Sequence, residues 1–249
     1  MFSLAIYSPK GGVGKTSTAI NLAYLAASEQ CSTLLWDWDP QAAATWFLGD
    51  QNHSEGSNKA IRLFSKGLPV GELEQRTPYP RLSLIPADDS LRKMDIKLHE
   101  LTQPQKLMCK LINPLSEHAR YLLHDCPPLI SPAMAYLLNT CDTILIPVIP
   151  SPLSMVAAER FVSNLKAKKS EIRCVGFFNQ VDLRRSLHKQ LVQSPQSTGI
   201  PMLTTWVPYD ANVEKMALTR KPINLIAPQS RASKAYQALW QEVKQLAEI

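Results

Sequence analysis

The stretch Lys10-Gly11-Gly12-Val13-Gly14-Lys15-Thr16, near the start of this 249-residue chain, decides the fold. It follows an apolar run, Phe2 to Tyr7, and opens a helical pattern over about Thr16 to Ser28. Glycines let the backbone curl around phosphates, while amide N–H groups and the helix N-terminus face the anion. In such a loop the lysine before the threonine reaches the β- and γ-phosphates, and the threonine hydroxyl binds Mg²⁺. The stretch therefore predicts a phosphate-binding loop.

The strict pattern G-x-x-x-x-G-K-[ST] is not met, because Pro9 stands at its first position. A glycine-rich turn with a chance Gly-Lys-Thr is the alternative interpretation. The preceding strand and the following helix favour the phosphate-binding loop.

Apolar runs of strand length alternate with helical patterns along the rest of the chain. Continuous apolar strands with helices between them indicate a mostly parallel, twisted sheet with helices on both faces, in an α/β fold. One domain over residues 1–249 is expected, with a variable excursion at about 50–80 and a closing helix at about 230–247. The expected strands are Phe2 to Tyr7, Ser32 to Trp36, Arg81 to Ile85, Tyr121 to Leu123, Thr143 to Val148, Arg173 to Phe178 and Met202 to Val207.

The formal charge of +6 is unevenly distributed. Residues 1–150 carry 13 Lys and Arg against 14 Asp and Glu, and residues 151–249 carry 14 against 7. This asymmetry indicates a polyanionic partner or merely a solvated basic surface. No apolar run approaches the roughly 18 residues of a membrane-spanning helix. The five cysteines form no CxxC pair, which suits a reducing cytoplasm.

Lys10 turns the loop into the deviant Walker A motif KGGVGKT, so the chain resembles the ParA/MinD family of P-loop ATPases. The resemblance implies ATP and Mg²⁺ as ligands and a sandwich homodimer formed on ATP binding. In that family the first lysine, here Lys10, contacts the nucleotide of the partner subunit. A second cation at the triphosphate offsets charge on the transferred phosphoryl group.

The resemblance extends to other motifs in family order. Asp37-Trp38-Asp39-Pro40-Gln41 matches switch I of the family, which implies that Asp39 positions the attacking water and that Asp37 supports the site or the Mg²⁺ shell. Trp36 and Trp38 are expected to pack. The segment Asp125-Cys126-Pro127-Pro128 matches the family segment whose aspartate binds Mg²⁺, so Asp125 is the implied Mg²⁺ ligand. Asn179 matches the family residue that contacts adenine. Gln180 stands where the guanine-binding motif N-K-x-D has a lysine. This departure from the motif favours ATP as the nucleotide. The implied nucleotide-contacting residues are Lys10, Gly11, Gly12, Val13, Gly14, Lys15, Thr16, Ser17, Asn179, Pro208 and Asp210; Thr16 and Asp125 are the implied metal ligands, and Lys10 and Asp39 the catalytic residues.

Among the branches of the family, the chain resembles the small ParA-type partition and positioning ATPases. These bind nucleoid DNA nonspecifically, and an adaptor on the cargo (a plasmid, a chromosome region or an assembly such as a carboxysome) stimulates hydrolysis. Arg184, Arg185, Arg220 and Lys221 are the favoured DNA contacts, because scattered basic residues bind phosphates without sequence preference. No membrane partner is expected. A MinD-like regulator that cycles on a membrane is the alternative, and a metabolic P-loop enzyme such as an amide ligase is a third.

Overall fold

The computed structural model describes residues 1–49, 60–65, 69–167 and 172–248. Within these ranges the strands are β1 (Phe2–Ile6), β2 (Thr33–Asp37), β3 (Gln75–Arg76), β4 (Leu82–Ile85), β5 (Tyr121–Asp125), β6 (Thr143–Val148) and β7 (Arg173–Phe178). The helices are α1 (Lys15–Ser28), α2 (Ala43–Leu48), α3 (Arg62–Ser65), α4 (Met94–His99), α5 (Pro104–Ile112), α6 (Pro132–Leu138), α7 (Pro152–Ala167), α8 (Ser186–Gln193), α9 (Ala211–Thr219), α10 (Ile223–Ile226) and α11 (Arg231–Ala247). Short 3₁₀ turns occupy Val70–Glu72, Asp89–Lys93, Asn113–Glu117 and Pro195–Thr198.

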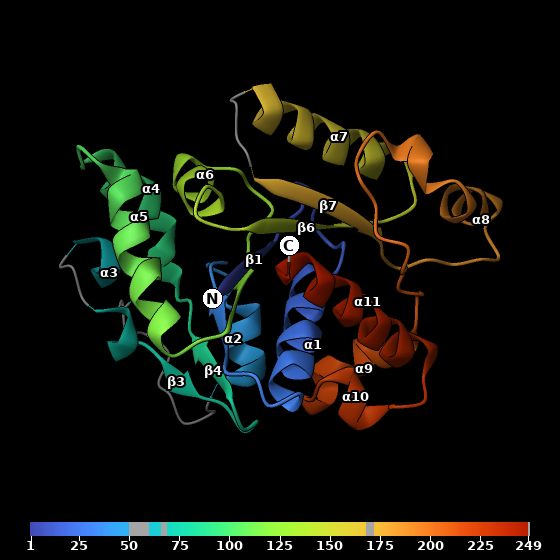
Figure 1. The fold of residues 1–249 in the computed structure, drawn as a ribbon, viewed down its shortest axis with the longest axis horizontal. Helices are drawn as coiled ribbons and strands as arrows, with labels where there is room; N and C mark the ends of the chain where they lie inside the picture. Colours follow the sequence, from blue (N-terminus) through green and yellow to red (C-terminus); the bar gives the residue numbers. More distant parts are fainter. Residues whose placement is uncertain (50–59, 66–68, 168–171, 249) are drawn as a thin grey trace.

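The strands form one twisted sheet in the order β3-β4-β2-β5-β1-β6-β7 (Figure 1). All neighbouring pairs are parallel except the short edge pair β3–β4. Parallel neighbours need crossover connections, and the helices between the strands supply them. The predicted α/β fold with a mostly parallel sheet is confirmed.

Alternate residues of the strands face two separate hydrophobic layers. In β1, Leu4 and Ile6 pack with α1, α2, α9, α10 and α11, whereas Ala5, and Tyr7 just after the strand, pack with α3 to α7. Figure 1 shows these two groups of helices on opposite sides of the sheet. Because both faces are covered, the strands are apolar throughout, which explains the continuous runs in the sequence.

The predicted strand Met202 to Val207 is wrong: this part of the chain forms only two isolated bridges, Met202 with Gly176 in β7 and Pro208 with Val181, three residues beyond the end of β7. Between these bridges the carboxylate of Glu242, in α11, accepts hydrogen bonds from the backbone N–H groups of Thr204, at 2.9 Å, and Thr205, at 2.7 Å. The Glu242 carboxylate thus accepts hydrogen bonds from backbone N–H groups that would otherwise be available to pair with β7. The pairing with β7 is interrupted for that reason.

The closing helix is present as α11, and its apolar side is buried by contact with α1 and the sheet. None of the helices in the described ranges is long and apolar enough to cross a bilayer. The expected excursion at 50–80 lies partly outside the described residues; its described part contains α3 and β3.

Candidate nucleotide-binding site

The predicted phosphate-binding loop connects the carboxyl end of β1 to the N-terminus of α1. Gly12 and Gly14 have φ angles of 72° and 86°, in the left-handed region that glycine adopts without strain. A Cβ on Gly14 would also lie 2.4 Å from Nδ2 of Asn179. These positions therefore require glycine for backbone conformation and, at Gly14, for space.

The carbonyl groups of this loop are held from outside by side chains. Asn179 Nδ2 donates to the Val13 carbonyl at 2.7 Å, Gln180 Nε2 donates to the Gly12 carbonyl at 2.6 Å, and Lys15 Nζ donates to the Lys10 carbonyl at 3.2 Å. By contrast, the backbone N–H groups of residues 11–14 donate no hydrogen bond to any described residue. A loop whose carbonyls are engaged and whose amides are free is built to receive an anion.

Lys15 is 8% exposed at the start of α1. Burial lowers the pKa of its ammonium group, while the carboxylates of Asp125 and Asp39 oppose that shift. A desolvated cation with free amides beside it binds phosphate more strongly than a surface lysine does, because the interaction is less screened by water.

Asp37 organises the segment that carries Asp39. Its carboxylate accepts hydrogen bonds from the Asp39 N–H at 3.0 Å and from the N–H and hydroxyl of Thr45, both at 2.8 Å. Burial raises the pKa of Asp37, although these hydrogen bonds oppose the rise. The Asp39 side chain is half-buried and accepts one bond, from the Gln41 N–H at 2.9 Å. Asp37 is thus a structural acceptor, and Asp39 keeps one carboxylate oxygen available.

Asp125 ends β5 directly beside Asp37 in the sheet register. It is buried, and neither of its carboxylate oxygens has a hydrogen-bond partner among the described residues. Burial raises the pKa of this carboxyl, the neighbouring Asp37 raises it further, and Thr16 and Lys15 oppose the rise. An unpartnered buried carboxylate beside a threonine hydroxyl fits a hard cation such as Mg²⁺, which commonly takes one or two protein carboxylates and completes its shell with phosphates and water.

Lys10 extends from the loop toward the start of α7. Its ammonium group donates to the Ser154 hydroxyl at 3.2 Å, and Ser154 also accepts from the Ser151 hydroxyl at 2.9 Å. The side chain is only partly buried and has no carboxylate partner among the described residues. Lys10 is therefore held by a neutral contact that costs little to break.

Trp36 and Trp38 are buried and stack on each other, as expected, and Trp38 also enters a buried polar network. Its indole Nε1–H donates to Nδ1 of His124 at 2.9 Å, and His124 Nε2 lies 3.0 Å from the Ser3 hydroxyl. Because an indole only donates, Nδ1 is the acceptor, and the imidazole proton resides on Nε2. Burial lowers the pKa of His124 to about 3, so the ring is neutral.

The segment that contains Pro208 and Asp210 lies beside Asn179. Pro208 bridges to Val181, and the Tyr209 N–H donates to the Val181 carbonyl at 2.9 Å. The Asp210 carboxylate caps α9 by accepting from the Asn212 N–H at 2.9 Å. The structure therefore brings the two expected base-contacting segments together, with Asp210 occupied by a cap.

The four predicted DNA contacts have different surroundings. Arg184 is exposed but forms a bidentate pair with Asp182, with both distances 2.8 Å, and this pair lowers the pKa of Asp182 to about 2. Arg185 and Lys221 are exposed. Arg220 is half-buried: it donates to the Gly49 carbonyl at 2.7 Å and stacks over the Trp46 ring at 5.2 Å.

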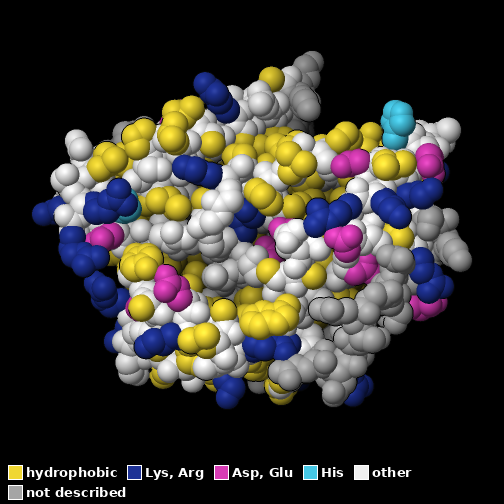
Figure 2. Space-filling view, turned by 180° about the vertical axis from the view of Figure 1, so that it is seen from behind, with side chains coloured by type: hydrophobic (Ala, Val, Ile, Leu, Met, Phe, Trp, Pro, Cys, Tyr) yellow, Lys and Arg dark blue, Asp and Glu magenta, His cyan; other side chains and the backbone are white. Residues whose placement is uncertain are grey.

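Arg220 therefore has a structural role that the sequence did not reveal. On the face seen in Figure 2, Lys and Arg side chains lie in several separate groups with hydrophobic side chains between them. On this face the basic side chains are dispersed, and Arg220 and Lys221, although neighbours in the sequence, differ in exposure.

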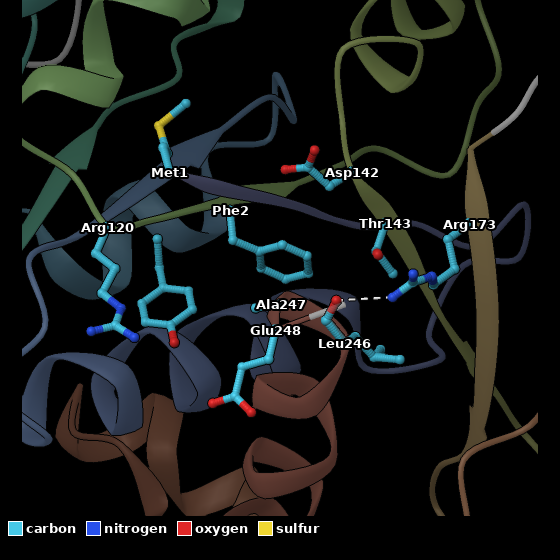
Figure 3. A pocket seen from close by; sticks show the side chains of 10 residues that line it. Met1, Phe2, Arg120, Asp142, Thr143, Arg173, Leu246, Ala247 and Glu248 are labelled. Atoms are coloured by element: carbon cyan, nitrogen blue, oxygen red, sulfur yellow. Dashed lines mark hydrogen bonds between the residues drawn. The ribbon is translucent and has the colours of Figure 1, made fainter.

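A cavity of about 460 Å³ lies away from the phosphate-binding loop, where β1, β5, β6 and β7 begin (Figure 3). Phe2, Arg120, Thr143 and Arg173 contribute to its lining, and Arg173 donates to the Leu246 carbonyl at 2.9 Å. None of the loop residues lines this cavity. The glycine-rich loop, with its free amides and with Asp39 and Asp125 near Lys15, is the candidate nucleotide site, and this cavity is separate from it.

Sequence reasoning missed three contributors to the site. Gln180 was used only to argue against guanine, yet its amide holds the Gly12 carbonyl. Ser154 holds Lys10, and His124 holds Trp38. His124 directly precedes Asp125, and a histidine inside an apolar strand was a usable signal; nothing in the sequence indicated Ser154.

Comparison with known proteins agrees with this geometry. A family profile described as an AAA domain matches residues 1–174. The chromosome partitioning protein ParA of Myxococcus xanthus is 27% identical over 247 residues, 96% of this chain and 87% of that protein. An ATP complex of a McdA variant from Cyanothece has a TM-score of 0.83 at 19% identity, covering 100% of this chain and 97% of that one. The cell division ATPase MinD of Pyrococcus furiosus has a TM-score of 0.81 at 18% identity, covering 98% and 99%.

The parallel sheet, the glycine-rich loop before α1 and the carboxylates after β2 and β5 define a P-loop nucleotide-binding protein. The family profile spans the loop and both carboxylate segments. The chain belongs to this AAA-domain family and, within it, to the ParA/MinD-type P-loop ATPases.

Proposed function

We propose that this protein is a ParA-type positioning ATPase, which hydrolyses ATP, dimerises on ATP and binds DNA without sequence preference. The observation that carries the proposal is the phosphate-binding loop, whose carbonyls are held by Asn179 and Gln180 while its amides remain free. Relatives that carry the names ParA and McdA add support at the level of the family.

The residues of the site divide the work of phosphoryl transfer. The free amides of the loop and the Lys15 ammonium bind the phosphates, and the Thr16 hydroxyl and Asp125 carboxylate would hold Mg²⁺. Mg²⁺, when bound, neutralises phosphate charge. Asp39, with one carboxylate oxygen that accepts no hydrogen bond from a described residue, orients the attacking water through a hydrogen bond. Asn179 and the segment from Pro208 to Asp210 form the base side of the site.

The dimer is supported by the surface around Lys10. Leu153 and Val156, at the start of α7, are large apolar side chains that are exposed, and they lie within two residues of Ser154, which holds Lys10. Scattered exposed apolar residues are ordinary, but exposed apolar side chains next to a cation of the site favour an association surface. Lys10, held only by Ser154, is free to reach the nucleotide of a second copy.

DNA binding is supported by the charge of residues 151–249 and by the exposed side chains of Arg185 and Lys221. Arg184 contributes less to DNA binding, because its charge is neutralised by the ion pair with Asp182. Arg220 contributes indirectly, by stabilising the fold through its bond to Gly49. A cargo-bound adaptor that stimulates hydrolysis and a location on the nucleoid complete the proposal. The membrane alternative gains no support from α11, whose apolar side packs against α1 and the sheet.

The test is an ATP-dependent shift of plain DNA of unrelated sequence, compared with ADP and with no nucleotide. We expect a shift with Mg²⁺ and ATP only, weakening steeply with salt. Lys15→Ala should abolish both nucleotide binding and the shift, whereas Lys106→Ala, on the exposed side of α5 and outside the basic region 151–249, serves as the matched lysine control. Sedimentation with anionic vesicles instead of DNA would favour the MinD-like alternative. ATP turnover without dimerisation, dependent on an added carboxylic acid and amine donor, would favour the amide ligase.

A further inference from the structure

The buried contact between Trp38 and His124 links the two carboxylate segments of the site. Trp38 stands between Asp37 and Asp39, and His124 stands next to Asp125. Both side chains are fully buried, and the hydrogen bond between them is 2.9 Å long. A second bond runs parallel to it in the backbone, from the Trp38 N–H to the Asp125 carbonyl, also at 2.9 Å.

The network is anchored at its far end in β1, an interior strand of the sheet. Ser3, in β1, faces His124 Nε2 at 3.0 Å, and its backbone N–H donates to the Asp142 carboxylate at 2.7 Å. Trp36 stacks on Trp38 with ring centroids 4.3 Å apart. The indole of Trp38 is therefore fixed in both position and rotation by packing and by a directional bond.

Packing of the core does not by itself require a hydrogen bond between an indole and an imidazole. A fully buried indole and imidazole lose hydration, and a core of apolar side chains would avoid that cost. The bond instead defines one rotamer of Trp38, and that rotamer sets the path of the backbone from Asp37 to Asp39. Sites for chemistry must hold their groups within a fraction of an ångström, and residues behind the contacting groups provide that precision.

On the basis of the proposed ATPase function, we propose that Trp38 and His124 are positioning residues for hydrolysis: their hydrogen bond sets the placement of the Asp39 carboxylate relative to Asp125. Neither residue touches the nucleotide in this scheme. Trp38 acts through the backbone of Asp39, and His124 acts through Trp38. Binding of ATP depends on the loop and is independent of the pair.

A double-mutant cycle separates positioning from stability. Trp38→Phe leaves His124 Nδ1 buried without a donor, and His124→Leu leaves the indole N–H buried without an acceptor, so each single variant should melt at a lower temperature. The double variant removes both groups and should regain part of that loss. Single-turnover hydrolysis of bound ATP should nevertheless stay about ten- to a hundredfold slow in all three variants, as expected for a misplacement of about 1 Å. The affinity for ATP should stay within twofold of the wild-type value.

Trp240→Phe is the matched control, because Trp240 is buried against Tyr121 in the opposite hydrophobic layer. It should lower the melting temperature without slowing hydrolysis. A double variant that hydrolyses ATP at the wild-type rate, or rates that recover in step with melting temperature across the cycle, would overturn the positioning role.

A second readout does not depend on turnover. The Trp38 indole proton, assigned by its loss in Trp38→Phe, should resonate downfield and exchange slowly, and His124→Leu should abolish that signature. Its resonance should also move when Mg²⁺ and ATP are added. A wild-type protein that never hydrolyses ATP would refute the proposed function, whereas an indole signal unchanged by His124→Leu would refute the pairing itself.

Discussion

The side-chain amide of Asn179 donates a hydrogen bond to the backbone carbonyl of Val13 at 2.7 Å, across 166 positions of sequence. Asn179 follows β7, and Val13 lies in the loop after β1, so the bond fixes the phosphate-binding loop to the edge of the sheet that carries the base-contacting segments. The side-chain Oδ1 of Asn179 in turn accepts from the Gln180 N–H at 3.0 Å. Asn179 therefore shapes the loop, and under the proposed function the same residue contacts the base.

Replacing Asn179 by Ala should weaken ATP binding about tenfold or more. The buried Val13 carbonyl loses its partner, which costs about 1–3 kcal/mol and releases the loop. Gln180→Ala is the matched control, because its bond to Gly12 is solvent-exposed and its loss is better compensated by water. Titration calorimetry with ATP measures both variants. Equal losses for the two would show that the Asn179 contact has no special part in shaping the loop.

Asp125→Asn should stabilise the nucleotide-free protein, increasingly so as pH rises. The pKa of Asp125 is raised in the folded protein, so the unfolded chain releases this proton first as pH rises. Stability is consequently lost above the ordinary pKa of an aspartate, and asparagine removes that penalty. We expect a melting temperature higher by about 3 °C or more at pH 8 and a smaller gain at pH 5, by calorimetry. A gain that is independent of pH would refute this electrostatic account.

With Mg²⁺ and ATP present, the order should reverse. Wild-type protein gains stability from ligand binding, and Asp125→Asn gains less because its amide is a poorer ligand for Mg²⁺. ATP added with EDTA is the control, and it should stabilise both proteins by similar amounts.

Lys10→Ala should bind ATP normally but fail to form the ATP-dependent dimer. The side chain contributes only a neutral contact to Ser154 in this chain, so its removal leaves the loop intact. Light scattering after size exclusion, with a non-hydrolysable ATP analogue, measures the dimer. Ser154→Ala is the companion variant and should dimerise at least as well as wild type, since it frees Lys10. If Lys10→Ala formed the dimer at the same protein concentration as the wild type, that result would argue against a role for Lys10 across the interface.

Asp39→Ala should slow hydrolysis at least a hundredfold and leave dimers bound to DNA. We assign the Asp39 carboxylate to positioning the attacking water. In the variant Asp37 keeps its three hydrogen bonds, so the backbone of this segment should keep its path. Phosphate release and DNA retention after a chase with competitor DNA measure this. Rapid turnover in the variant would move the water-positioning role to another residue.

Arg220 and Lys221 are neighbours in sequence and should respond oppositely to substitution. Arg220→Ala removes the bond to the Gly49 carbonyl and the stacking on Trp46, so it should lower the unfolding free energy by about 1–2 kcal/mol. Lys221→Glu should leave stability within about 0.5 kcal/mol and reduce DNA binding with a smaller salt slope. Chemical denaturation and DNA titration over a range of salt concentrations distinguish the two. A stable Arg220→Ala with weakened DNA binding would restore Arg220 as a contact.

The local motifs were readable in the sequence because their conformation is determined over short distances. Glycines at 12 and 14 supply left-handed backbone, Lys15 begins the helix, and apolar runs indicate strands covered on both faces. Asp39 and Asp125 were identified through motifs that resemble those of the ParA/MinD family, and the position of Asp125 after an apolar run agrees with a carboxylate at the end of a parallel strand. The fold and the centre of the site were therefore predictable from residues within a few positions of each other.

Contacts between distant segments were decided only by the tertiary structure. Glu242 takes the N–H groups of Thr204 and Thr205 and so interrupts a strand that its own sequence favours. Arg220 is held over Trp46, which lies in a helix far away in the chain, and a basic residue expected on the surface became half-buried. The bond from Trp38 to His124 exists because β2 and β5 are neighbours in register. Sequence determines conformations set by backbone sterics and local burial; folding in three dimensions decides which polar groups meet, because hydrogen bonds extend over only about 3 Å.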